Sequence, residues 1–252
     1  MRFSVCLDAL YKGKDILDSI RAVKASGLTA IEFWGWENKD MEALSRVCRE
    51  EGLAVAAFCA KMGSLVQGLE KEAYLAGLRA SVNAARSVGC KTLIGLTGNE
   101  AEGLSRTRQH ENLVESLKNC APVLEEAGVQ LVLEPLNIIK DHKGYYLSRS
   151  EEAFEIVEKV GSAQVKVLFD IYHQQITEGN LIANITANVD KIGHFHAAGN
   201  PGRHELDNGE IHYPSIFRAI DAAGYKGFIG LEYFPLEEVS EGLAKLAELS
   251  RR

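Results

Sequence analysis

Short apolar runs recur along the whole chain, and a helix-ending residue stands shortly before nearly every one. Most of these runs are continuous rather than alternating in polarity, which is typical of parallel strands covered on both faces. They predict eight strands, at residues 3–7, 30–34, 54–59, 92–96, 130–134, 166–170, 192–196 and 228–233.

The predicted helix ends are the most regular part of this pattern. Glycine, and less often asparagine, adopts the left-handed conformation that ends a helix and turns the chain back. We expect this role at one position before each of strands two to eight: Gly27, Gly52, Gly89, Gly128, Gly161, Asn188 and Gly224. Apolar residues at helical spacing occupy the segments between strands, so the chain repeats a strand-then-helix unit eight times.

This repeat predicts an α/β fold, a single (βα)8 TIM barrel that takes in residues 1–252 as one domain. The length of 252 residues is usual for such a barrel, and no linker or low-complexity tract divides the chain. An open, doubly wound sheet is the structural alternative. It would need a topological switch point and usually a phosphate loop, but the sequence contains neither G-x-G-x-x-G nor a P-loop.

Composition indicates which classes of partner and which cellular compartment to expect. The formal net charge is -7, whereas nucleic acids and anionic membranes select basic surfaces. The five cysteines are widely spaced without any C-x-x-C, which indicates reduced thiols rather than disulfides or a zinc ribbon. No signal-peptide pattern precedes the first strand, and no apolar run approaches about 18 residues, so we expect a cytoplasmic protein.

Four predicted strands carry a metal-compatible side chain at the carboxyl end. These are Glu134, Asp170, His196 and Glu232, and 36, 26 and 36 residues separate them in turn, each about one βα unit. In a barrel, the side chains at the carboxyl ends of strands face the mouth. When these four residues face inward, their bulky apolar neighbours all face the helices, so one register satisfies every strand.

Three carboxylates and one imidazole form a hard oxygen and nitrogen set. It suits one divalent metal ion, Mn²⁺, Mg²⁺ or Co²⁺. Without a cation, the carboxylates would repel one another. A single acidic residue at a strand end is more often a helix N-cap or a rim ion pair, but four in register on consecutive strands favour a metal site.

Six short motifs lie in the second half of the chain: 134–137 (EPLN), 169–173 (FDIYH), 201–205 (PGRHE), 209–213 (GEIHY), 224–228 (GYKGF) and 230–233 (GLEY). They resemble those of the hydroxypyruvate isomerase family, in the xylose isomerase-like TIM barrel superfamily. The resemblance implies a divalent metal held by Glu134, Asp170, His196 and Glu232. It implies isomerisation of a small α-hydroxy carbonyl compound with Glu134 and Glu232 as the acid/base pair, and it suggests a homo-oligomer, dimer or tetramer.

Two positions depart from the pattern of the family. Hydroxypyruvate isomerases commonly carry glutamine at the position of His196, and histidine there resembles the related ketose 3-epimerases. The segment expected as D-x-P-G after the first glutamate reads Asp141-His142-Lys143-Gly144. Two substrate classes therefore stay open: a hydroxy-oxo acid of the hydroxypyruvate, tartronate-semialdehyde or 2-oxo-tetronate type, and a neutral sugar epimerised at C3.

His173 and Arg203 are predicted to bind the substrate. His173 lies three residues past Asp170 in the loop above the barrel, where it contacts a substrate oxygen or caps a helix. Arg203 lies in the glycine-rich loop after strand seven, where a planar fork of donors can grip a carboxylate or an oxyanion. The alternative for Arg203 is a loop-stabilising ion pair with Glu205 or Glu210.

Four further side chains have open roles. His194 faces inward one layer below His196 and is expected to be a packed, hydrogen-bonded neighbour of the site rather than a ligand. Glu32 ends strand two, where a rim ion pair and a substrate contact are equally compatible with the sequence. Nothing in the sequence places Lys61 or His204.

The sequence thus favours a metal-dependent isomerase that transfers a proton through an enediolate between Glu134 and Glu232. A ketose 3-epimerase is the alternative, favoured by His196. A phosphodiesterase of the endonuclease IV type would want a multinuclear site and a basic DNA groove, which the acidic balance and four ligands disfavour. A non-catalytic metal or sugar binder is the last alternative, and the intact Glu134 and Glu232 lend it no support.

Overall fold

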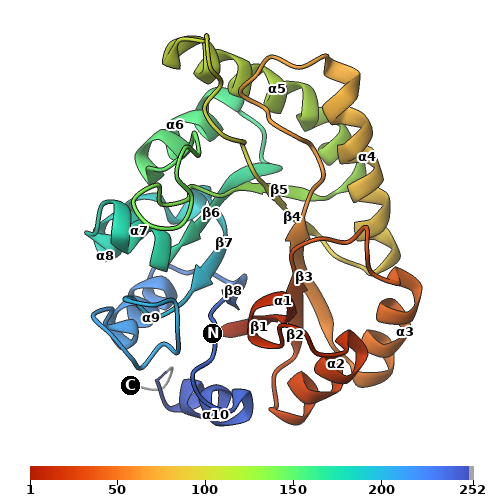
Figure 1. The fold of residues 1–252 in the computed structure, drawn as a ribbon, viewed down its shortest axis with the longest axis vertical. Helices are drawn as coiled ribbons and strands as arrows, with labels where there is room; N and C mark the ends of the chain where they lie inside the picture. The colour runs from red at the N-terminus through yellow and green to blue at the C-terminus, as the bar shows by residue number, and fades with distance from the viewer. Residues whose placement is uncertain (250–252) are drawn as a thin grey trace.

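The computed structural model describes residues 1–249. They form a closed barrel of eight parallel strands surrounded by helices (Figure 1). The strands are β1 (Arg2–Cys6), β2 (Ala30–Phe33), β3 (Ala54–Cys59), β4 (Thr92–Gly95), β5 (Gln130–Leu133), β6 (Val165–Asp170), β7 (Ile192–Ala197) and β8 (Phe228–Leu231). Each strand pairs with its neighbours in the sequence, and β1 pairs with β8 to close the barrel. The predicted (βα)8 fold is confirmed.

The helices lie outside the strands and cover the barrel on all sides (Figure 1). They are α1 (Leu7–Leu10), α2 (Ile16–Ala25), α3 (Met41–Glu51), α4 (Lys71–Ser87), α5 (Arg106–Ala127), α6 (Ser150–Val160), α7 (Ile171–Thr177), α8 (Leu181–Asn188), α9 (Tyr213–Ala222) and α10 (Val239–Leu249), with a short 3-10 helix η1 (Val189–Lys191). Two helices therefore follow β1 and two follow β6. No helix within residues 1–249 has both the length and the apolar character needed to cross a membrane.

Six of the seven predicted helix stops are confirmed. All six glycines have φ between 60° and 86°, the left-handed conformation that a residue without a Cβ adopts easily. The prediction for Asn188 is wrong, because its φ is -132°. Helix α8 ends at Asn188 and runs directly into η1, so the chain reaches β7 through a tight helical turn that needs no left-handed residue.

The core has two layers that follow the alternation of side chains along the strands. A small apolar cluster of Ala57, Ile94, Val132 and Leu168 fills the inside of the barrel. The larger outer core, between strands and helices, contains the bulky neighbours of the four site residues: Leu133, Phe169, Phe195 and Leu231. The predicted register is therefore confirmed. It leaves the carboxyl end of the barrel interior to polar side chains.

The cysteines take no part in covalent cross-links. All five are free, and four of them are buried. The structure pairs none of the five with another, as expected of reduced thiols.

Candidate active site

Four side chains converge at the carboxyl ends of β5 to β8. Glu134 directly follows β5, Asp170 ends β6, His196 lies in β7 and Glu232 directly follows β8. One ligand atom from each lies within 4.8 Å of the others, and all four residues are buried. The structure therefore brings together the whole predicted set, because neighbouring parallel strands end at the same rim.

His196 stands at the centre of this cluster. Its Nδ1 lies 3.4 Å from Glu134 Oε1 and 3.4 Å from Glu232 Oε2. Neither ring nitrogen has a hydrogen-bond partner within the described part of the chain. Burial of an imidazole without hydrogen-bond partners costs free energy. This geometry therefore fits a histidine that binds a cation.

Asp170 caps a helix and also belongs to the cluster. Its Oδ1 accepts the backbone N–H of His173 at 3.0 Å and so caps the first turn of α7. Its Oδ2 lies 3.6 Å from His173 Nε2 and 3.9 Å from the Arg203 guanidinium. The cap fixes the carboxylate while one oxygen remains turned toward the cluster.

Arg203 reaches into the cluster from the loop after β7. Its guanidinium pairs with Glu232 Oε2, and its Nε donates to the Glu232 carbonyl at 3.3 Å. Its backbone is left-handed, with φ of 61°, a conformation that costs a non-glycine residue roughly 1–2 kcal/mol. Glu205 instead accepts the backbone N–H groups of Leu236 and Glu237, at 2.8 and 3.2 Å. Arg203 therefore pairs with a carboxylate of the cluster rather than with an acidic residue of its own loop.

The charges in the cluster shift the pKa values of its members. Burial alone would raise the pKa of Glu232, but the charges of Arg203 and His196 outweigh it and hold this pKa well below its ordinary range. Burial raises the pKa of Asp170, and Arg203 only partly offsets the effect. Burial would lower the pKa of His196, yet the carboxylates of Glu232 and Glu32 raise it well above its ordinary value. The cluster thus attracts positive charge.

The donor set fits a divalent cation. Three buried carboxylates and an imidazole nitrogen without a partner converge on one point, and hard divalent ions take such ligands. The cation would replace the positive charge that the cluster otherwise draws onto His196. The residues that would hold it are the four predicted from the sequence.

His173 is held with one nitrogen toward Asp170. Asn137 Oδ1 accepts the backbone N–H groups of Lys140 and Asp141, at 3.0 and 3.2 Å, which fixes the orientation of its amide. Asn137 Nδ2 therefore faces His173 Nδ1, 2.6 Å away, and donates to it, and the backbone N–H of Asn137 donates to the same nitrogen at 3.3 Å. Because Nδ1 accepts, the proton of the neutral ring lies on Nε2. Burial and the charge of Arg203 lower the pKa of His173 to about 4, so the ring is neutral at pH 7.

Replacing Asn137 with aspartate should reverse this arrangement. A carboxylate beside Nδ1 accepts rather than donates, and an opposite charge at this distance raises a histidine pKa by about one to three. We expect ¹⁵N NMR of the labelled imidazole to show Nδ1 protonated in Asn137→Asp and Nε2 protonated in the unchanged chain. An unchanged ring spectrum in the variant would contradict the role of the Asn137 side chain and leave the tautomer to the Asn137 backbone N–H, 3.3 Å from Nδ1. Asn119→Asp, on α5, is the control.

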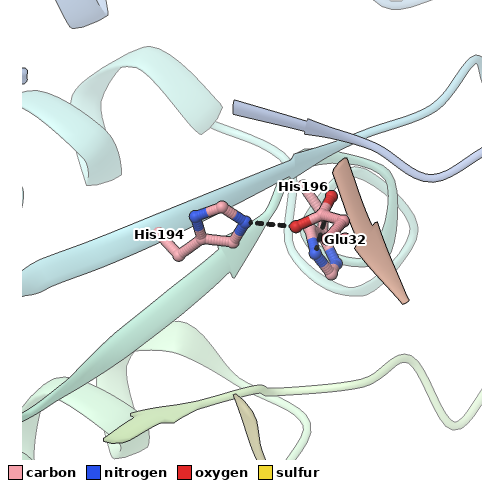
Figure 2. A group of neighbouring side chains, drawn as sticks. All are labelled: Glu32, His194 and His196. Carbon is pink, nitrogen blue, oxygen red and sulfur yellow. Dashed lines mark hydrogen bonds and ion pairs between the residues drawn. The ribbon is translucent and has the colours of Figure 1, made fainter. Parts of the chain in front are cut away.

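A second polar layer lies beneath the cluster. Glu32, on β2, is 1% exposed, and its Oε2 accepts a hydrogen bond from His194 Nε2 at 2.8 Å. Figure 2 shows the Glu32 carboxylate between the rings of His194 and His196. The predicted second-layer position of His194 is confirmed. The expected rim ion pair of Glu32 is wrong, because β2 places this carboxylate inside the barrel, where it pairs with His194.

A cavity of about 290 Å³ opens onto the cluster. Six polar or charged residues line it: Glu134, His142, His173, His196, Arg203 and Glu232. Six largely apolar residues complete the lining: Trp34, Cys59, Ile94, Leu96, Leu136 and Phe234. Trp34 Nε1 also donates to Glu232 Oε1 at 2.5 Å, so both oxygens of this carboxylate are held.

Two of the residues that the sequence left unplaced lie outside the cavity. Lys61 is largely exposed and pairs with Glu37 at 3.2 Å. His204 donates from Nδ1 to the Phe234 carbonyl at 2.7 Å. Sequence reasoning missed the role of Asn137, although it lies three residues past Glu134 in the EPLN motif. The signal was the spacing, because asparagine accepts backbone N–H groups in a following turn.

Known proteins share this architecture. The sequence model of the xylose isomerase-like TIM barrel family matches residues 20–249. The chain is 32% identical over 252 residues to the hydroxypyruvate isomerase of Escherichia coli (strain K12), covering 96% of this chain and 97% of that protein. It is 34% identical over 254 residues to the 2-oxo-tetronate isomerase of Cupriavidus necator, covering 97% of each. The crystal structure of AP endonuclease, family 2, from Brucella melitensis superposes with a TM-score of 0.93 at 27% identity, covering 98% of each chain.

Proposed function

The chain belongs to the xylose isomerase-like TIM barrel family and is an isomerase, and we propose that it interconverts the aldehyde and ketone forms of a small hydroxy-oxo acid with one divalent metal ion. The names of the two curated relatives support this substrate class, since hydroxypyruvate and 2-oxo-tetronate both combine a carboxylate with an oxo group. The small cavity supports a substrate of a few carbon atoms.

The observation that carries the proposal is the position of Arg203. Its side chain is only 13% exposed, lines the cavity and pairs with a carboxylate of the metal cluster. A guanidinium fixed in this way presents further N–H donors to a substrate carboxylate in a site of low dielectric constant. A neutral sugar offers no carboxylate to this guanidinium.

Glu134 and Glu232 are the proposed acid and base. They come from opposite ends of the strand set β5 to β8 and lie equally far from His196 Nδ1. One carboxylate removes a proton from the carbon beside the carbonyl, and the other returns a proton to the neighbouring carbon of the enediolate. When bound, the divalent ion supplies Lewis-acid polarisation of the carbonyl.

The surrounding residues prepare these groups before the substrate enters. Trp34 and Arg203 each hold one oxygen of Glu232, so the orientation of its carboxylate is fixed. His173 turns its Nε2–H toward Asp170 and lines the cavity, where it can donate to a substrate oxygen. Groups held in advance lower the entropic part of the barrier.

A ketose 3-epimerase is the second candidate, and the histidine at position 196 favours it. Epimerisation uses the same acid and base, but the proton returns to the opposite face of the same carbon. The two reactions differ in substrate charge, so substrate preference separates them.

Turnover of a substrate panel should therefore separate them. We expect activity on hydroxypyruvate or 2-oxo-tetronate at least about tenfold above that on neutral ketoses, since a charge-assisted hydrogen bond contributes about 1.5–3 kcal/mol. Mn²⁺, Mg²⁺ and Co²⁺ would each be supplied, and activity would be measured before and after chelation. We expect chelation to abolish turnover and the added ion to restore it.

Two outcomes would contradict the proposal in different ways. Full activity after verified removal of all metal would exclude a role for the ion. Activity on ketoses without activity on the acids would select the epimerase instead.

A further inference from the structure

Glu32 is a buried carboxylate that the proposed reaction does not use. Its Oε2 is bonded to His194, whereas its Oε1 has no hydrogen-bond partner in the described part of the chain. This free oxygen lies 3.6 Å from His196 Nε2, which has no partner either (Figure 2). Two unsatisfied buried atoms, one acceptor and one potential donor, thus face each other.

A cation bound at Nδ1, the other ring nitrogen of His196, would allow Nε2 to donate a hydrogen bond to Glu32 Oε1. Nδ1 is the nitrogen that faces Glu134 and Glu232, so it is the one that would meet a cation. A neutral imidazole that gives the lone pair of Nδ1 to a cation carries its proton on Nε2. That proton points toward Glu32 Oε1, and a small closing movement makes it a hydrogen bond.

The neighbouring strand leaves room for this contact. A Cβ atom on Gly230, in β8, would lie 1.8 Å from Glu32 Oε1 and 2.7 Å from His196 Cδ2. Any larger residue at position 230 would displace the Glu32 carboxylate, the His196 ring or both. Glycine is therefore required there for Glu32 and His196 to lie against each other.

We propose that Glu32, itself anchored by His194, is a positioning residue that holds His196 with Nδ1 toward the metal and thereby sets the affinity of the site for the ion. The proposal rests on the metal role given above. Outer carboxylates that orient ligating histidines typically contribute about 10- to 100-fold in metal affinity.

Titration of Mn²⁺ into the metal-free, full-length chain tests the proposal. We expect one ion per unchanged chain and a Kd about 10- to 100-fold higher in Glu32→Gln. Ser4→Ala is the matched control, because Ser4 is fully buried, neighbours Gly230 in the β1–β8 register and has an unpartnered Oγ. Its Kd should be unchanged. The melting temperature without metal separates lost affinity from lost folding.

Gly230→Ala provides a second route to the same contact. We expect it to raise the Kd for Mn²⁺ when Glu32 is present, because the new Cβ displaces the carboxylate. In a Glu32→Ala background the same change should add little, since no carboxylate is left to displace. Coupling of this kind in a double-mutant cycle shows that both residues act through one contact.

Three outcomes would overturn the proposal. A Glu32→Gln chain that binds Mn²⁺ as tightly as the unchanged chain would remove the role of Glu32 while leaving the metal site intact. Two bound ions, one of them lost in Glu32→Gln, would make Glu32 a ligand instead. An unchanged chain that binds no Mn²⁺ would end both this inference and the metal role on which it rests.

Discussion

Glutamine at position 134 or 232 is expected to lower kcat by about 10²- to 10⁴-fold, the usual contribution of a general acid or base. Each substitution keeps the shape of the side chain but removes the group that accepts the proton. Both carboxylates are also proposed ligands, so kcat must be measured at saturating Mn²⁺, with bound metal quantified in the same samples.

A matched control exists in the loop after β7. Glu205 is as buried as the two site glutamates, but its Oε1 accepts only backbone N–H groups. Glu205→Gln keeps an oxygen acceptor and should retain near-normal turnover. If the Glu134→Gln and Glu232→Gln chains bind metal and also keep near-normal kcat, neither residue is the acid or base.

Arg203→Met is expected to lower kcat/KM for a carboxylated substrate by about 10²- to 10³-fold. Truncating one partner of a buried, hydrogen-bonded charge pair costs about 2–5 kcal/mol of binding free energy, and it also leaves Glu232 without its counter-charge. The substrate carboxylate loses its donor as well. The kcat/KM of Arg203→Lys should lie between the values of the unchanged chain and of Arg203→Met, since lysine keeps the charge but not the planar fork of donors.

The comparison between substrates isolates the direct contact. A neutral ketose should be affected less than an acid, because only the acid loses a partner of its own. Arg106→Met is the control. Arg106, on α5, pairs with carboxylates and lies over the ring of Tyr146, as Arg203 lies over the ring of Tyr172. An equal loss for acid and ketose would show that Arg203 acts only on Glu232.

The sequence alone determined the barrel and the four strand-end residues. Strand parity and helix-ending glycines are local properties, so they can be counted along the chain without knowledge of distant contacts. Neighbouring strands then bring Glu134, Asp170, His196 and Glu232 together by topology. The prediction for Asn188 was wrong because asparagine can end a helix in the left-handed conformation or lead into a 3-10 turn. Local composition does not distinguish these two conformations.

Only the tertiary structure decided how the remaining polar groups are paired. Arg203 had carboxylates nearby in the sequence, yet it pairs with one 29 residues away. Asn137 meets His173 across 36 residues, and Glu32 meets His194 across 162. A buried polar group takes whichever partner the closed barrel places within hydrogen-bond distance. Such distances are set by the packing of all eight strands, so no single segment of the sequence contains them.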